Sequence, residues 1–127
     1  MRREGFTAMI VLHIDEPIPS LNKSIGGHWS RQLKHRQRWQ WLTRAAILRA
    51  QIFVPPKWTR AKIRIERYGQ RILDADNVRG GAKALIDALK YEEIIADDSP
   101  ANIGEPEIRQ FVSRTERRTV VYVEQAA

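Results

Sequence analysis

The sequence predicts a single α/β domain in which a mixed β-sheet of about four strands packs against two main helices. The chain has 127 residues, which is the length of one domain rather than two, and we expect residues 1–127 to form that domain. Short segments with alternating apolar residues are interleaved with longer segments in which apolar residues recur every three or four positions. The predicted order is strand, helix, strand, helix, strand, strand, and helical crossovers of this kind commonly join parallel strands.

The first half of the chain is predicted to form a strand, a loop and a long helix. Residues 8–14 (AMIVLHI) have the composition of a strand, and residues 15–27, rich in Pro, Ser, Asn and Gly, that of a loop. A helix is predicted from Ser30 to Ile52, before two prolines that cannot continue it. Apolar residues at helical spacing predict its buried stripe: Trp41, Ala45, Leu48 and Ile52.

The middle of the chain is predicted to form a strand followed by a second helix. Residues 61–68 (AKIRIERY) alternate between apolar and charged side chains, which is typical of a half-buried strand. Residues 69–77 (GQRILDADN) predict a turn or loop. The second helix is expected to begin between residues 78 and 81 and to end at Tyr91. Its apolar side is formed by five residues: Val78, Ala82, Leu85, Ile86 and Leu89.

The end of the chain is predicted to complete the sheet. Residues 97–106 (DDSPANIGEP) predict a loop, and residues 107–113 and 118–124 predict two closing strands.

No apolar run approaches the roughly 18 residues that span a membrane, and we find no signal-peptide pattern, so we expect a cytoplasmic protein with no membrane partner. Cysteine is absent, which excludes disulfides, cysteine–zinc sites and thiol catalysis.

Charge is distributed unevenly along the chain. The formal net charge is +7, but residues 17–72 hold 13 Lys and Arg against a single acid, Glu66. Residues 73–107 hold three Lys and Arg against nine acids. A basic region suits a polyanion, most often nucleic acid. The acidic region would repel the same ligand unless its carboxylates surround a cation, so it calls for an explanation of its own.

The acids are concentrated in residues 73–98 (LDADNVRGGAKALIDALKYEEIIADD). Asp74 and Asp76 are separated by one residue, so in an extended segment their side chains share a face, and Asp97 and Asp98 follow the second helix. A helix that returns to the sheet would bring the two pairs together. Converging carboxylates are ligands suited to Mg²⁺ or Mn²⁺. Magnesium keeps room for water and phosphate, which is the arrangement of metal-assisted phosphodiester hydrolysis.

One lysine lies between the two acid pairs. Lys83 stands four residues before Asp87, which places both on one face of the predicted helix. In one interpretation the two form a surface ion pair. In the other, Lys83 is a cation directed at the scissile phosphate or at the oxyanion that develops there. The spacing alone leaves both interpretations open.

The motif as a whole resembles the RusA family of Holliday-junction resolvases, which contains phage- and prophage-encoded endonucleases that cut four-way DNA junctions. The resemblance is carried by D-x-D-N (residues 74–77), a lysine, D-A-L (residues 87–89) and D-D (residues 97–98). Upstream, PIPSLNKSIGGHW (residues 17–29) is similar to the family's loop after the first strand. AKIRIERY occupies the place of the family's strand before the acidic loop.

The resemblance implies a RusA-like fold, dependence on Mg²⁺ with Mn²⁺ as a substitute, and a homodimer that resolves four-way junctions in recombination and repair. It implies hydrolysis of a phosphodiester by a metal-activated water, in a bacterial cell or a phage-infected host. Asp74, Asp76 and Asp98 match the family's metal ligands, and Lys83 matches its catalytic lysine. Two other classes stay open: a non-catalytic nucleic-acid-binding protein with a structural acidic loop, and a nuclease for other branched DNA such as flaps.

The spacing within the motif departs from the family. In resolvase-type members the lysine follows the second aspartate by four residues, whereas Asp76 and Lys83 are seven apart, as if Arg79, Gly80 and Gly81 were inserted. A continuous helix would return both to one face, but two glycines cost about 1 kcal/mol each against alanine. A loop that delays the helix is an equal alternative. Arg79 is a rival for the cationic role, and the longer spacing is similar to a phage branch of the family.

The segment 23–49 contains no acid. We expect its basic residues to contact DNA phosphates, with binding that weakens steeply as salt rises, while a solvated helix face is the alternative. Trp29 and Trp39 could stack on unpaired bases, although packing within the protein is favoured for each tryptophan. The residues predicted to bind DNA are Asn22, Lys23, His28, Arg31, Lys34, Arg36, Arg38 and Arg79.

Overall fold

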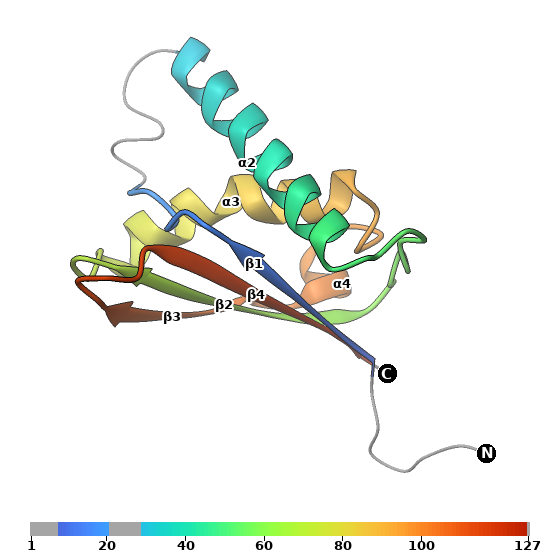
Figure 1. The fold of residues 1–127 in the computed structure, drawn as a ribbon. Helices are drawn as coiled ribbons and strands as arrows, with labels where there is room; N and C mark the ends of the chain where they lie inside the picture. Colours follow the sequence, from blue (N-terminus) through green and yellow to red (C-terminus); the bar gives the residue numbers. More distant parts are fainter. Residues whose placement is uncertain (1–7, 21–28, 127) are drawn as a thin grey trace.

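The computed structural model describes residues 8–20 and 29–126, which form a four-stranded sheet with helices packed against it (Figure 1). The predicted α/β fold and its order of strand, helix, strand, helix, strand, strand are confirmed, with one additional short helix. In chain order the elements are β1 (Met9–Ile14), α2 (Trp29–Arg49), β2 (Ala61–Gly69), α3 (Ala75–Tyr91), α4 (Pro100–Ile103), β3 (Glu107–Val112) and β4 (Arg118–Gln125).

The strand order in the sheet is β1-β4-β2-β3. β4 runs antiparallel to both of its neighbours, whereas β3 runs parallel to β2, because α3 carries the chain from the end of β2 back toward the start of β3. The register places Val121 of β4 opposite both Leu12 of β1 and Ile65 of β2. The two closing strands are therefore not neighbours, since β2 lies between them.

The hydrophobic core lies between the sheet and the helices α2 and α3, which Figure 1 shows on the same side of the sheet. Ile63 and Ile65 of β2 are buried in it, as their alternation predicts. Helix α3 adds four buried residues from its predicted apolar side: Val78, Ala82, Leu85 and Leu89. None of the helices in the described part of the chain is long and apolar enough to span a membrane.

Helix α2 differs from the prediction in its ends and in its buried face. It begins at Trp29 and ends at Arg49, and Gln51 has a positive φ of 60°, so the chain leaves the helix before the prolines are reached. Two residues of the predicted stripe are wrong, because Trp41 is 68% exposed and Leu48 is 57% exposed, whereas Ala45 is half-buried and Ile52, beyond the end of the helix, packs against the core. The buried residues are instead Trp39, Thr43, Ala46 and Ile47.

Thr43 explains the error. Its hydroxyl donates a hydrogen bond to the carbonyl oxygen of Trp39 at 2.6 Å, so the polar group is satisfied inside the core. A hydrophobicity pattern counts threonine as polar and therefore rotates the expected face of the helix toward Trp41. The helical period was predicted correctly, but the side of the helix that faces the core was not.

Helix α3 begins at Ala75, earlier than the predicted start between residues 78 and 81. The predicted loop at 69–77 is shorter as a consequence, and Arg79, Gly80 and Gly81 all lie within the helix. Of the two alternatives for the inserted residues, the continuous helix is therefore the one that the structure adopts.

Gly81 is required by a close approach between α3 and the loop after β1. A Cβ atom built on Gly81 would lie 2.0 Å from the carbonyl oxygen of Pro19 and 2.9 Å from Cγ2 of Ile18. The loop thus packs directly on the backbone of the helix. Glycine costs helix stability at this position, but its lack of a Cβ permits the contact.

We expect Gly81→Ala to destabilise the protein by about 1–3 kcal/mol, the usual range for over-packing, although alanine is the better helix former. Urea denaturation of the variant and the wild type measures the change. Gly80→Ala serves as the comparison, because it brings the same gain in helix propensity one residue away. A midpoint for Gly81→Ala equal to or above that of the wild type would contradict the packing role.

The predicted loop at 97–106 contains the short helix α4. Ser99 is its N-cap residue, and Pro100 occupies the first turn, where its missing N–H is not needed. The side-chain amide of Asn102 donates to the carbonyl oxygen of Thr59 at 2.8 Å, and Ile103 is buried. These contacts hold the segment that follows Asp98 beside the start of β2.

Candidate active site

A cleft of about 480 Å³ lies between the first half of α3 and the segment that contains α4. Four of the residues predicted from sequence line this α3–α4 cleft: Asp76, Arg79, Lys83 and Asp98. Glu105, from the residues after α4, also lines it. The structure thus brings together one aspartate from each acidic pair and both candidate cations.

Helical geometry accounts for three of these positions. Arg79 and Lys83 follow Asp76 by three and seven residues in an uninterrupted helix, so the three side chains share one face of α3. The longer spacing of this chain therefore keeps Lys83 on the same face as Asp76, two turns further along the helix, because seven residues make nearly two full turns. Continuity of the helix through Gly80 and Gly81 is the condition for this arrangement.

The second half of the site joins α3 to Asp98. The side chains of Asp87 and Asp98 come close enough for a hydrogen bond, so a segment beyond the end of α3 meets the helix at this point. Burial raises the pKa of Asp87 above its usual range, the positive charge of Lys83 lowers it in part, and Asp98 raises it further. Asp87, which the sequence offered as the helical neighbour of Lys83 and as the aspartate of the D-A-L motif, thus lies beside Asp98.

A small groove of about 170 Å³ between α2 and α3 adjoins the cleft. Lys83 and Gly80 line both hollows, and Arg36 and Asp87 line the groove. His35 also lines it; burial lowers the pKa of its imidazole, and a hydrogen bond with the backbone of Gly81 offsets this in part. The groove connects the basic helix α2 with the carboxyl pair.

Asp97 is engaged outside the cleft. Its carboxylate lies 2.9 Å from Nζ of Lys90, whereas the distance from that nitrogen to Asp98 is 3.9 Å. The hydrogen bond with Lys90 lowers the pKa of Asp97 and raises that of Lys90. We infer that Asp97 tethers the end of α3 to the following turn and leaves Asp98 to face the cleft.

The two candidate cations differ in their partners. Nε of Arg79 lies 3.5 Å from a carboxylate oxygen of Glu105, across the mouth of the cleft. Lys83 forms no salt bridge within residues 8–20 and 29–126, although its charge acts on Asp87. Lys83 is exposed and lies next to the carboxyl pair, which makes it the better placed cation for a phosphate in the cleft.

Asp74 is placed differently from the other predicted ligands. It is the N-cap residue of α3, is exposed, and is not among the residues that line the α3–α4 cleft. The loop that carries it is held by Gln110 of β3, which accepts a hydrogen bond from the N–H of Leu73 and donates one to its carbonyl oxygen, both at 2.9 Å. Gln110 is thus a positioning residue that the sequence did not reveal.

The donor set of the cleft fits a magnesium ion with few protein ligands. In the described ranges no three Asp, Glu or His side chains are close enough together to hold a metal ion, so the predicted trio of aspartates is not assembled as one cluster. Mg²⁺ commonly takes one or two carboxylates and fills its other positions with water and phosphate oxygens. Asp76 and Asp98 line the same cleft and offer such carboxylates, with Asp87 beside Asp98.

Apart from Arg79, the predicted DNA-binding residues fall into two groups. Asn22, Lys23 and His28 lie outside the described residues. Arg31, Lys34, Arg36 and Arg38 are exposed on α2. Arg38 forms a salt bridge of 2.6 Å with Glu16, and Arg36 lines the groove beside Lys83. Trp29 is 71% exposed at the start of the helix, whereas Trp39 is packed in the core.

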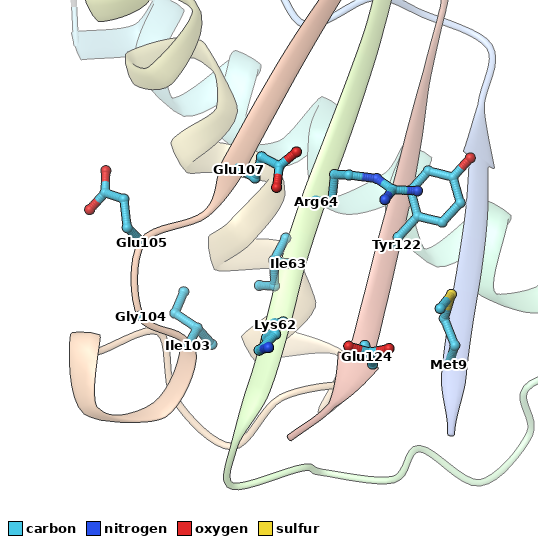
Figure 2. Close-up of a pocket in the computed structure, with 10 residues that line it drawn as sticks. All are labelled: Met9, Lys62, Ile63, Arg64, Ile103, Gly104, Glu105, Glu107, Tyr122 and Glu124. Carbon is cyan, nitrogen blue, oxygen red and sulfur yellow. The ribbon is translucent and has the colours of Figure 1, made fainter. Parts of the chain in front are cut away.

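Another hollow, of about 450 Å³, lies on the sheet face that is turned away from the helices (Figure 2). The guanidinium carbon of Arg64 lies 4.1 Å from the centre of the Tyr122 ring, and Figure 2 shows the two side chains in contact. Tyr122 donates a hydrogen bond to Glu66 at 3.1 Å. None of the site residues predicted from sequence lines this hollow.

Neutralising Asp87 is expected to stabilise the protein. Asp87→Asn removes a carboxylate whose charged form is disfavoured by burial and by Asp98, so the melting temperature measured in EDTA near neutral pH should rise by a few degrees. Asp97→Asn is the matched control, because it removes a carboxylate that Lys90 stabilises and should not raise the melting temperature. A lower melting temperature for Asp87→Asn would show that the carboxylate is not under strain.

No protein-family model matches this chain, and no curated protein matches it either. The resemblance to RusA-type resolvases is therefore carried by the motif residues themselves. Of these, Asp76, Lys83 and Asp98 line one cleft in the structure.

Proposed function

We propose that this protein is a Mg²⁺-dependent endonuclease that cuts branched DNA, with the four-way junction as its substrate. The observation that carries the proposal is the convergence of Asp76, Lys83 and Asp98 on one cleft, although Asp98 comes from a segment beyond the end of α3. Clustered carboxylates with an adjacent lysine suit phosphoryl chemistry, in which both the metal and the cation stabilise negative charge. Recombination and repair are the processes in which such an enzyme would act.

The chain's own carboxylates would hold the metal. Asp76 and Asp98 face the cleft, Asp87 is hydrogen-bonded to Asp98, and the resemblance adds Asp74 to the proposed ligands. A bound Mg²⁺, or Mn²⁺ in its place, would supply Lewis-acid polarisation of the phosphate and a lowered pKa for water. A bound cation would favour the charged form of Asp87, whose pKa is raised by burial, because metal ligands act as carboxylates.

Lys83 would stabilise the scissile phosphate. Its ammonium group is close enough to Asp87 to lower the pKa of that residue, and it borders both the cleft and the groove toward α2. A fixed positive charge at this place favours the transition state, in which negative charge grows on the phosphate oxygens. Arg79, which pairs with Glu105, would instead contribute to holding the DNA.

The basic helix α2 would hold the DNA that leads into the cleft. Arg31, Lys34 and Arg36 are exposed along its first half, and Arg36 lies beside the groove that adjoins the cleft. Contacts of this type fix the position of a duplex without reading its sequence. Binding should then weaken steeply as the salt concentration rises.

We also propose a homodimer, as the resemblance implies. Trp41 and Leu48 are exposed and seven residues apart, so they share one face of α2, and the exposed Phe53 and Val54 follow the helix. A second copy of the chain would remove this apolar surface from water. Four-way junctions are cut by paired nicks, which two symmetry-related sites would supply.

Trp41→Ser is expected to weaken the dimer about tenfold or more, because an interfacial tryptophan is typically worth at least about 2 kcal/mol. Sedimentation velocity over a range of concentrations gives the dissociation constant. Val112→Ser, which removes an exposed apolar residue from the edge strand β3, is the control and should leave it unchanged. A monomeric wild-type protein would rule out the dimer, and an unchanged constant for Trp41→Ser would rule out this surface.

A non-catalytic nucleic-acid-binding protein is the second candidate function. It is favoured by the position of Asp74 at the N-cap of α3 and by the lack of a three-carboxylate group in the part of the chain that the structure describes. Such a protein would bind DNA equally well in Mg²⁺ and in EDTA. It would not lose its function when a single aspartate of the cleft is neutralised.

The deciding experiment is the incubation of a labelled synthetic four-way junction, a matched duplex and a flap with Mg²⁺ or with EDTA. Paired symmetric nicks on the junction alone, in Mg²⁺ alone, are the expected result. Metal-dependent cutting of the flap instead would keep the chemistry and replace the substrate. Tight binding without cutting in either Mg²⁺ or Mn²⁺ would overturn the proposal in favour of the binding protein.

A further inference from the structure

A second cleft, of about 440 Å³, is lined almost entirely by basic and neutral residues. It is formed by the end of β2 and the turn that follows it, the loop after β1, and the turn before β4. Three arginines line it, Arg67, Arg71 and Arg117, against one acid, Glu16. We name it the Arg67 cleft.

Within residues 8–20 and 29–126, no carboxylate forms a salt bridge with the buried guanidinium of Arg67. The residue is only 7% exposed, its Nε donates to the carbonyl oxygen of Ile18 at 2.7 Å, and its NH1 donates to the carbonyl oxygen of Arg71 at 3.0 Å. Both acceptors are neutral, so they orient the guanidinium but do not cancel its charge. A charge buried in this way is costly unless an opposite charge reaches it.

Gly69 keeps room for this guanidinium. A Cβ atom at Gly69 would lie 2.7 Å from NH1 of Arg67, which would force the arginine out of its present position. The site is therefore built around Arg67 by two backbone carbonyls and a missing side chain. Burial lowers the pKa of Arg67, and the positive charge of Arg71 lowers it further, because the two guanidinium groups repel each other.

Glu16 does not relieve this repulsion. Its carboxylate lies 2.6 Å from NH2 of Arg38 and accepts a hydrogen bond from Nε of Arg38 at 3.1 Å, so its charge is directed to α2. Arg71 and Arg117 are exposed, which leaves them at the mouth of the cleft. A compact anion that enters between the three arginines would cancel the excess positive charge.

We propose that the Arg67 cleft binds a phosphate group of the nucleic-acid backbone, away from the phosphate that is cut. Arginine recognises phosphate through paired N–H donors, and Arg67 is held in a fixed orientation for this purpose. Leu73, which lines the cleft, directly precedes Asp74 and lies three residues before Asp76, so one chain segment connects the two sites. The choice of nucleic acid over free phosphate rests on the proposed function.

The test compares DNA binding by two double variants in EDTA, where no cutting occurs. Arg71→Gln with Arg117→Gln should weaken binding of a labelled junction at least tenfold near 150 mM salt, and should reduce the slope of log affinity against log salt by about 1–2. The control, Lys57→Gln with Arg109→Gln, removes the same charge from two residues outside α2 that are paired with Glu93 and Glu107, and should change affinity less than twofold. Arg67 is left in place because it is buried.

A second arm distinguishes free phosphate from DNA. Inorganic phosphate should raise the melting temperature of the wild type above that in chloride at equal ionic strength, and should not do so for the Arg71/Arg117 variant. Unchanged DNA affinity in that variant overturns the proposal, including the case in which free phosphate still stabilises the wild type. A protein that binds DNA through these arginines but never cuts it would overturn the proposed function alone.

Discussion

Asp98→Asn is expected to reduce Mg²⁺-dependent cleavage of branched DNA by at least about 10²–10³-fold, the loss that follows removal of one preorganised electrostatic group. Asp98 lines the α3–α4 cleft and is hydrogen-bonded to Asp87, so it belongs to the donor set that would hold the metal. Asp76→Asn should have an effect of similar size. DNA binding should be intact or tighter in both variants, because a negative charge that repels the phosphates is removed.

Asp97→Asn provides the matched control for this result. Asp97 is the immediate neighbour of Asp98 but is engaged with Lys90 at 2.9 Å, so its loss should cost little activity. Single-turnover nicking and anisotropy in EDTA measure cleavage and binding separately. Equal losses of cleavage in Asp97→Asn and Asp98→Asn, or a loss of binding that parallels the loss of cleavage, would mean that the cleft is not the catalytic centre.

Lys83→Ala is the second variant with a large expected effect. We expect a loss of about 10²–10³-fold in the rate of cleavage with little change in binding, because the charge of Lys83 would act mainly on the transition state. Arg79→Ala should reduce the rate of cleavage much less, because Arg79 forms a salt bridge with Glu105 at 3.5 Å. Lys90→Ala is the control for the loss of a positive charge, because Lys90 lies on the same helix as Lys83 and pairs with Asp97.

The comparison of these variants decides which cation acts in the cleft. A larger rate loss for Arg79→Ala than for Lys83→Ala would transfer the role to Arg79. Similar small losses in Lys83→Ala and Lys90→Ala would mean that the charge of Lys83 has no special role in cleavage. The rate at saturating DNA is the quantity to compare, because a change confined to KM would indicate substrate binding only.

The fold was largely predictable, because alternation in β2 and the helical period in α3 are local properties of the sequence. What failed depends on contacts between distant residues. The buried face of α2 includes Thr43, whose hydroxyl is hydrogen-bonded to the backbone of Trp39, so a polar side chain lies in the core. The passage of α3 through Gly81 goes with the close approach of Pro19, a contact that local helix propensity does not contain.

The candidate site was predictable in its residues but not in its arrangement. The motif singled out Asp76, Lys83 and Asp98, and the structure places all three on one cleft. It could not reveal that Asp87 is hydrogen-bonded to Asp98, because this contact depends on how the chain turns after α3. The separate position of Asp74 likewise follows from the start of the helix at Ala75, one residue after it.

The most direct test of the central claim, that the α3–α4 cleft holds the catalytic metal, is to map where a metal binds. Fe²⁺ in place of Mg²⁺, with ascorbate and peroxide, generates hydroxyl radicals that cut the protein backbone close to the metal, and mass spectrometry locates the cuts. Cuts near residues 76–83 and 98 that excess Mg²⁺ suppresses are the predicted result. Cuts confined to other segments, or none that Mg²⁺ suppresses, would contradict a metal site in this cleft.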